Sequence, residues 1–287
     1  MRGRYFWLPV VFTAWAVAVQ PIAWADRETG PDRAAKITVS FELYRDYLIV
    51  VRGAAGPLKG LNFLLDTGAT PSVLDLRIAR KLHLNVTPTD IAVLNGSVQG
   101  GMATVPRLEF GPIRSDNLPV LIEDLSFLQK ALPVQVDGMI GLDVLGDSTF
   151  VIDYALREIR FGPAPSMPVS IPLQLKQGLP IVDATINYVA VHLLLDTGAP
   201  SLILFQEMSE PASGASVSSK AIGDFDRKQV RLISFQLGVA EFGRKPAFMV
   251  HNRRDAGHNF DGLMSPAALG ITRLAFDLGR GTLAFAR

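Results

Sequence analysis

Two copies of one hexapeptide constrain this chain more than any other feature of its sequence. Leu-Leu-Asp-Thr-Gly-Ala occurs at 64–69 and again at 194–199, and the flanking residues match as well, reading LNFLLDTGAT and VHLLLDTGAP. A single Asp-Thr-Gly is common, but two copies that each follow an apolar run indicate an internal repeat. The repeat predicts two similar lobes, each with one acidic side chain, Asp66 or Asp196, at an equivalent position.

Other landmarks extend the repeat beyond the hexapeptide. They keep their order along the chain, and the spacing shortens gradually in the second copy. The two hexapeptides are 130 residues apart. Leu108–Gly111 matches Phe235–Gly238, which begins 127 residues later. The segment 137–146 matches 261–270, and Asp153 matches Asp277, in both cases 124 residues later.

The boundary between the lobes is predicted at a cluster of glycine and proline at 162–168. It divides the chain into an N-terminal lobe at 26–162 and a C-terminal lobe at 163–287. Each lobe has the size of an ordinary small domain.

The first 25 residues have the pattern of a secretory signal peptide. Arg2 and Arg4 supply the positive start, Tyr5–Val19 the apolar stretch, and Ala23-Trp24-Ala25 a cleavage site. The alternative is an uncleaved membrane anchor, although Pro9, Gln20 and Pro21 shorten the apolar run. The expected location is periplasmic or secreted, with no stable membrane insertion after cleavage.

Composition restricts the function further. The apolar fraction is 48%, which is enough for a sizeable core, and cysteine is absent, which excludes disulfides and a thiol nucleophile. Removal of 1–25 takes away two arginines and no acid, so the formal charge changes from +1 to −1. A near-neutral chain gives no reason to expect nucleic-acid binding.

The body of the chain is predicted to be mostly β, with a few short helices. Short runs rich in Val, Ile and Leu are bounded by Gly, Pro and Asn, which is typical of strands. A helix is predicted at Ser72–Leu82 from its approximate helical spacing, and its counterpart at Ser201–Met208. The strand runs are Tyr47–Val51, Leu61–Leu65, Val151–Ile152, Ile181–Ile186 and Val191–Leu195.

Asp-Thr-Gly after an apolar strand suits acid–base chemistry if the two copies meet. Two carboxylates at contact distance cannot both ionise, so they share a proton, and one acts as base while the other acts as acid. Gly68 and Gly198 have no Cβ and allow a tight turn with close approach of another backbone. The hydroxyls of Thr67 and Thr197 can bond across to the partner loop. The predicted catalytic pair is therefore Asp66 and Asp196.

These residues resemble the retropepsin-like aspartic proteases, in particular bacterial two-lobed versions. The matching elements are Asp66–Ala69, a flap candidate at Asn95–Met102 with Gly100 and Gly101, and Met139–Gly141, followed in the second half by Asp196–Ala199 and Leu263–Met264. The resemblance covers nearly all of 40–287. It implies a bilobal acid-protease-like fold from two tandem lobes, an interlobe cleft, and endopeptidase activity on an extended peptide.

Some positions depart from the family pattern. Ser265 stands where the second lobe should have the glycine that matches Gly141, and Gly100–Gly101 has no counterpart in the second lobe. Gly100 and Gly101 fit a substrate-binding flap or an ordinary hairpin turn equally well. A decayed protease that keeps a peptide-binding cleft is therefore an alternative, as is a homodimer with one competent lobe.

The remaining candidates favour structural roles. Asp153 and Asp277 are expected at strand ends, and Asp137 and Asp261 as turn caps. Asp143 occurs in one copy only, which argues against a shared catalytic role. The four histidines show no metal-binding spacing. The sequence thus predicts a monomeric aspartic endopeptidase with a protein or peptide substrate and without metal or cofactor.

Overall fold

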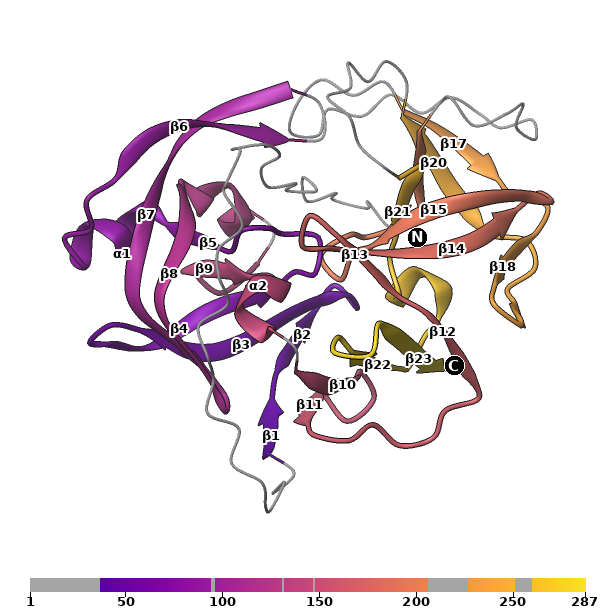
Figure 1. Cartoon of the computed structure of the whole chain (residues 1–287). Coiled ribbons are helices and arrows are strands. Elements are labelled where there is room, and N and C mark those ends of the chain that lie inside the picture. Colours follow the sequence, from indigo (N-terminus) through magenta and orange to yellow (C-terminus); the bar gives the residue numbers. More distant parts are fainter. Residues whose placement is uncertain (1–36, 94–95, 131, 147, 206–226, 251–259) are drawn as a thin grey trace.

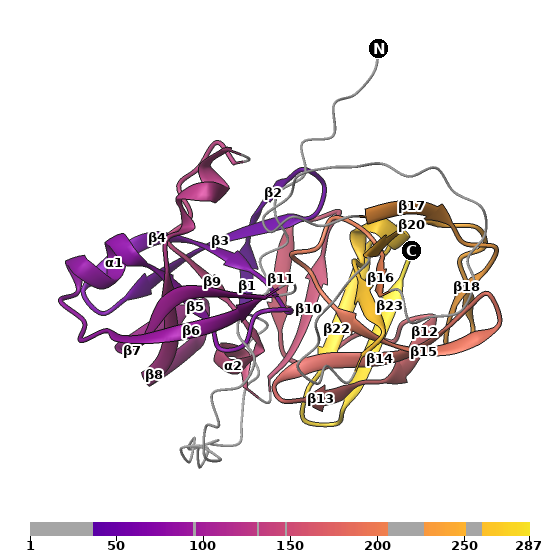
Figure 2. The ribbon, with the colours of Figure 1, turned by 90° about the horizontal axis from the view of Figure 1, so that it is seen from above.

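The computed structural model of the chain describes residues 37–93, 96–130, 132–146, 148–205, 227–250 and 260–287. Most of them lie in β-strands, which form three sheets, and every run predicted as a strand falls in one, Tyr47 alone preceding its strand. Strands of the first half lie on one side and strands of the second half on the other (Figures 1 and 2). The fold is all-β and bilobal.

The predicted leader, 1–25, lies outside the described residues. Among the residues that the structure describes, no helix has the length and apolar character needed to span a membrane.

An eight-stranded sheet carries the first Asp-Thr-Gly sequence. Its order is β2-β3-β4-β9-β5-β8-β7-β6, and β3 also pairs with β7, so the sheet curls back on itself. The strands are β2 (Glu42–Tyr44), β3 (Leu48–Ala55), β4 (Leu58–Leu65), β5 (Val73–Asp75), β6 (Thr87–Val93), β7 (Gly96–Phe110), β8 (Ile113–Glu123) and β9 (Gly138–Ile140).

A nine-stranded sheet carries the second Asp-Thr-Gly sequence. Its order is β17-β20-β16-β21-β15-β14-β18-β19, with β13 added on β14. The strands are β13 (Gln174–Lys176), β14 (Leu179–Ile186), β15 (Val189–Leu195), β16 (Ile203–Phe205), β17 (Arg227–Arg231), β18 (Phe235–Leu237), β19 (Ala240–Glu241), β20 (Pro246–Val250) and β21 (Gly262–Met264).

The two sheets share one local arrangement around Asp-Thr-Gly. The strand that precedes the motif runs parallel to a three-residue strand, as β4 does to β9 and β15 to β21. That short strand then pairs antiparallel with the strand that follows the motif, β5 or β16. The short strands β5, β9, β16 and β21 and the last three residues of β4 and β15 are fully buried, which explains why the residues just before each motif form a continuous apolar run.

A six-stranded sheet joins the two halves. Strands β10 and β22, one from each half, pair antiparallel at its centre, and the rings of Phe150 and Phe276 stack with centroids 4.8 Å apart. The segment 162–168 connects β11 to β12. The strands, in sheet order, are β1 (Ile37–Ser40), β11 (Glu158–Phe161), β10 (Thr149–Asp153), β22 (Arg273–Asp277), β23 (Thr282–Ala286) and β12 (Val169–Pro172).

The helix predicted at Ser72–Leu82 is shorter than expected. Val73–Asp75 forms β5, which is buried between β9 and β8, and the helix α1 covers only Leu76–Lys81. Asp75 caps α1 by accepting a hydrogen bond from the Arg77 N–H. Pairing with two neighbouring strands satisfies the backbone of 73–75, and this tertiary contact overrides the helical spacing. The other helical segments are η1 (Leu125–Lys130), α2 (Leu142–Leu145) and η2 (Ala267–Leu269).

The helix predicted at Ser201–Met208 is also wrong in its described part. Ile203–Phe205 forms strand β16, fully buried between β20 and β21. Residues 206–208 lie outside the described residues. The reason is the same as for β5, because the strand occupies the equivalent place in its sheet.

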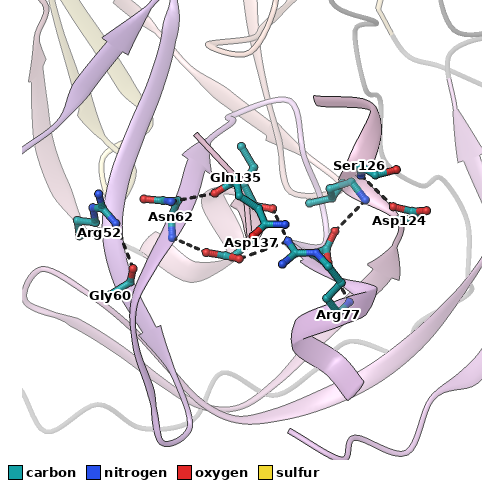
Figure 3. A network of polar contacts seen from close by, with 11 residues as sticks. Arg52, Gly60, Asn62, Arg77, Asp124, Ser126, Gln135 and Asp137 are labelled. Atoms are coloured by element: carbon teal, nitrogen blue, oxygen red, sulfur yellow. Dashed lines mark hydrogen bonds and ion pairs between the residues drawn. The ribbon is translucent and has the colours of Figure 1, made fainter. Parts of the chain in front are cut away.

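Asp137 and Asp261 join strands and do not cap turns as predicted. Asp137 accepts a hydrogen bond from the backbone N–H of Asn62 at 2.9 Å, and Asp261 accepts one from His192 N–H at 2.8 Å. Figure 3 shows that Asp137 also lies beside Arg77, at 3.4 Å from its guanidinium. Each carboxylate thus supports the strand that leads to an Asp-Thr-Gly sequence.

Asp153 links the halves through ion pairs. Its buried carboxylate lies 3.3 Å from the Arg160 guanidinium and 3.2 Å from that of Arg273, which belongs to the second half. It also accepts the Leu156 N–H at 3.0 Å. A carboxylate that is 3% exposed needs such partners, because a buried charge without them is costly.

We expect Asp153→Ala to lower the free energy of unfolding by about 2–3 kcal/mol, since it removes a buried, charge-assisted network. Urea unfolding monitored by circular dichroism measures the change. Asp116→Ala is the matched control, because Asp116 pairs with Arg107 and Arg114 on the surface. Equal midpoints for the two variants would show that the Asp153 network contributes nothing.

Candidate active site

The two Asp-Thr-Gly sequences meet where the halves face each other. Asp66 follows β4 and Asp196 follows β15, and each is held by a hydrogen bond from its backbone N–H to the adjacent short strand, at 2.9 Å to Ile140 O and 3.0 Å to Met264 O. Both side chains are buried, with 3% and 1% of their surface exposed. The apolar ends of β4 and β15 therefore place Asp66 and Asp196 together in a buried position between the two halves.

The carboxyl groups of Asp66 and Asp196 share a side-chain hydrogen bond. The glycine of each motif packs on the aspartate of the other. A Cβ on Gly68 would lie 2.8 Å from Asp196 Cγ, and one on Gly198 would lie 2.8 Å from Asp66 Oδ2. Glycine is required at both positions because any side chain would separate the acids.

The same glycines also hold their own aspartates. Gly68 N–H donates to Asp66 Oδ1 at 2.9 Å, and Gly198 N–H donates to Asp196 Oδ1 at 2.7 Å. One oxygen of each carboxyl is thereby fixed by a backbone donor. The orientation of each carboxyl is set by its own loop.

Thr67 and Thr197 bind the two loops to each other with four hydrogen bonds. Thr67 N–H donates to Thr197 Oγ1 at 3.0 Å, and Thr197 N–H donates to Thr67 Oγ1 at 3.1 Å. Each hydroxyl then donates across the interface, from Thr67 to Leu195 O at 2.7 Å and from Thr197 to Leu65 O at 3.0 Å. The interaction is reciprocal, so both loops are held in the same way. We call this set of four bonds the threonine bridge.

Burial perturbs both acids, but not equally. It raises the pKa of Asp66 to about 6, opposed by hydrogen bonds from Gly68 N–H and Asp196. Burial also raises the pKa of Asp196 well above its ordinary value, and the neighbouring Asp66 charge raises it further. The pair titrates as one unit. Because both shifts are upward, the pair keeps a proton at pH values where an ordinary aspartate is ionised.

Two tyrosines that the sequence did not single out lie within electrostatic reach of Asp196. Burial raises the pKa of Tyr47 to about 12 and raises that of Tyr154 still more, and the Asp196 charge adds to both shifts. Both phenols therefore stay protonated near the acids. Tyr47 precedes β3 and Tyr154 follows β10, so both come from the first half.

Gly100 and Gly101 lie away from any turn. They sit inside β7, opposite Thr89 and Pro88 of β6, and residues 94–95, between these two strands, lie outside the described residues. A Cβ on Gly100 would meet Ile91 Cδ1 at 2.2 Å, and one on Gly101 would meet Val86 Cγ1 at 2.3 Å. The hairpin-turn interpretation of these glycines is wrong, because close packing requires them. Their role in a flap stays a prediction.

Within the described part of the chain, no group of three or more His, Asp or Glu side chains is arranged to hold a metal ion. His192 is half exposed, and its Nδ1 lies 2.7 Å from Asp183 on the surface. His251 and His258 lie outside the described residues.

We expect Thr197→Val to lower the free energy of unfolding by about 2–4 kcal/mol, because it leaves Leu65 O and Thr67 N–H buried without partners. Thr197→Ser keeps the hydroxyl and should retain most of the stability. Chemical denaturation of both variants measures the difference. An unchanged midpoint for Thr197→Val would contradict the role of the threonine bridge.

The raised pKa values make stability depend on pH. The folded state keeps a proton on the acid pair that the unfolded chain releases near its ordinary pKa of 3.8. Stability should therefore fall as pH rises from about 4 through about 6. Asp196→Asn removes the strongest shift, so its stability should fall less over this range. Urea midpoints at a series of pH values test this, and parallel curves for parent and variant would contradict it.

Comparison with known proteins agrees with this geometry. Residues 51–144 match the model of a protein family described as aspartyl protease. The match includes Asp66, Thr67 and Gly68 and extends beyond Gly141, whereas Asp196 lies outside it. No curated protein matches the chain. Over residues 51–144, the chain is therefore similar to the aspartyl proteases.

Proposed function

We propose that the protein is an aspartic endopeptidase that hydrolyses peptide bonds with a water activated between Asp66 and Asp196. The observation that carries the proposal is the meeting of two buried carboxyl groups, Asp66 and Asp196, each packed against the glycine of the other motif. The family match supports proteolysis as the class of reaction. The assignment of the two catalytic residues is our own.

In the proposed reaction, ionised Asp66 takes a proton from the water while the water oxygen attacks the carbonyl carbon of the scissile bond. Asp196 gives its proton to the carbonyl oxygen, which produces a neutral tetrahedral diol. Asp196 then takes one proton back from the diol, Asp66 gives its proton to the amide nitrogen, and the C–N bond breaks. The pair ends with one proton, as it began. Such acid–base catalysis supplies roughly 10²–10⁴-fold, so positioning of the substrate supplies the rest.

The pair itself provides both the base and the acid, so the proposal requires no metal or cofactor. Both acids come from one chain, which supports a monomer as the active form over a homodimer with one competent lobe. The proposed substrate is a protein or an extended peptide, with no part for nucleic acid. The leader-like pattern at 1–25 supports a periplasmic or secreted location.

The two halves recur in a way that supports descent from a duplicated lobe, with the junction near 162. Leu64 pairs with Met139 as Leu194 pairs with Leu263, which are the offsets of 130 and 124 residues found between the landmarks. Strand β5 pairs parallel with β8 as β16 does with β20. The alternative of a decayed, peptide-binding protein gains nothing from this geometry, because both acids, both glycines and the threonine bridge are intact.

We expect Asp66→Asn and Asp196→Asn each to lower kcat/KM on a peptide library by at least about 100-fold, since each removes the base or the acid. Asp277→Asn is the matched control and should leave the rate unchanged, because Asp277 contacts Arg280 in the joining sheet. Mass spectrometry of the cleaved library measures the rates. Full activity in either site variant would refute the proposed function.

The pH profile of kcat/KM gives a second readout of the same pair. The rate should rise as pH increases through about 6, where Asp66 ionises, and fall at higher pH, where Asp196 loses its proton. A rate that falls steadily from pH 4 to pH 7 would contradict the assignment of Asp66 as base.

A further inference from the structure

The loop that follows Asp66 is held in place by the carboxylate of Asp143. Ser72 donates two hydrogen bonds to the carboxylate of Asp143, from its N–H at 2.8 Å and from its hydroxyl at 2.6 Å. The same hydroxyl accepts the N–H of Gly141 at 2.9 Å. Ser72 is fully buried. These three bonds join the end of the loop at 66–72 to the segment after β9, and we call them the serine clamp.

The clamp closes a tight contact between the same two segments. A Cβ on Gly141 would lie only 2.1 Å from Ala69 O and 2.9 Å from Asp143 Oδ1. At the other end of the loop, Asp66 N–H already donates to Ile140 O. The loop that carries Asp66 is therefore fastened at both ends to residues 140–143.

The loop that carries Asp196 lacks this clamp. By the offsets of 130 and 124 residues, Leu202 stands in place of Ser72, Ala267 in place of Asp143, and Ser265 in place of Gly141. Within the part of the chain that the structure describes, the buried Ser265 hydroxyl accepts a long bond, from Ala268 N–H at 3.4 Å. A side chain fits at Ser265 where none fits at Gly141, so the second loop lies less closely on its neighbour.

Asp143 is suited to hold the loop by charge as well as by shape. Burial raises the pKa of its carboxyl, and the bonds from Ser72 oppose that rise. Bonds from neutral donors to a carboxylate are stronger than bonds between neutral groups. The two Ser72 donors therefore stabilise the ionised form, and an apolar residue at 143 would leave both without an acceptor.

We propose that Asp143 is a positioning residue, which acts through Ser72 and Gly141 to fix the loop of Asp66 and so orients the catalytic base toward the attacking water. The proposal rests on the function proposed above. It assigns unequal parts to the two halves, since the serine clamp holds the loop of the base, Asp66, while the loop of the acid, Asp196, has no such clamp.

The effect of losing the clamp should appear in catalysis more than in binding. A misplacement of about 1 Å in a catalytic group can cost roughly 100-fold in rate. Asp143→Ala and Ser72→Ala should each lower kcat by about 10- to 100-fold with little change in KM. The double variant should be no worse than either single one, because the two residues act as a unit. Ser72→Thr keeps the hydroxyl and should restore kcat.

Asp137→Ala is the matched control. Asp137 is a buried, hydrogen-bonded carboxylate in the same sheet, but it holds Asn62 and Arg77 rather than the loop of Asp66. This variant should lose stability and keep kcat. If Asp143→Ala and Asp137→Ala lower the unfolding midpoint alike and both keep kcat, Asp143 has only a structural role and the proposal is overturned.

A spectroscopic readout separates this proposal from the proposed function. Carbon-13 NMR of the aspartate carboxyls follows Asp66 directly, with or without proteolysis. A looser loop weakens the Gly68 N–H bond that opposes the rise in the Asp66 pKa, so the Asp66 titration should move to higher pH in both Asp143→Ala and Ser72→Ala. Ser72→Ala changes no charge, so a shift common to both variants reports loop geometry. An unmoved titration overturns the positioning role, whereas retained proteolysis in Asp66→Asn overturns the function.

Discussion

The reciprocal hydrogen bonds of Thr67 and Thr197 are the interaction on which the site depends. Each hydroxyl accepts a backbone N–H of the other loop and donates to a carbonyl of the opposite strand, so neither loop can move without breaking bonds in both. The bridge lies directly beside the acids, because threonine follows aspartate in both motifs. It brings two groups together that would repel each other if both were ionised.

That constraint produces the chemistry. Carboxyls forced together in a buried place cannot both carry charge, and the cost of a second charge appears as a raised pKa for the coupled pair. The fold must offset this cost elsewhere. The large apolar core, the Asp153 ion pairs and the strand-bridging carboxylates of Asp137 and Asp261 provide the stability that lets an unfavourable pair persist.

Many of the strands and the pairing of the two acids could be predicted from the sequence, because the patterns that indicate them are local and occur twice. Strands such as β4 and β15 are apolar runs, and the doubled motif indicated that Asp66 and Asp196 meet. The errors have one cause, which is that distant partners decide the outcome. Val73–Asp75 was predicted as part of a helix but is paired on both sides, and Gly100, for which a hairpin turn was one of two interpretations, lies inside a strand against Ile91. The partnership of Ser72 with Asp143 spans 71 positions, and a residue present in one copy only carried no weight in a comparison of repeats.

The shared proton is the centre of this account, and neutron diffraction from crystals grown near pH 6 would locate it. The account predicts one deuterium between the facing oxygens of Asp66 and Asp196, closer to Asp196. Each carboxyl should also keep the hydrogen bond from the glycine N–H of its own loop. Two bare carboxylates turned away from each other, each bound to separate solvent, would contradict it.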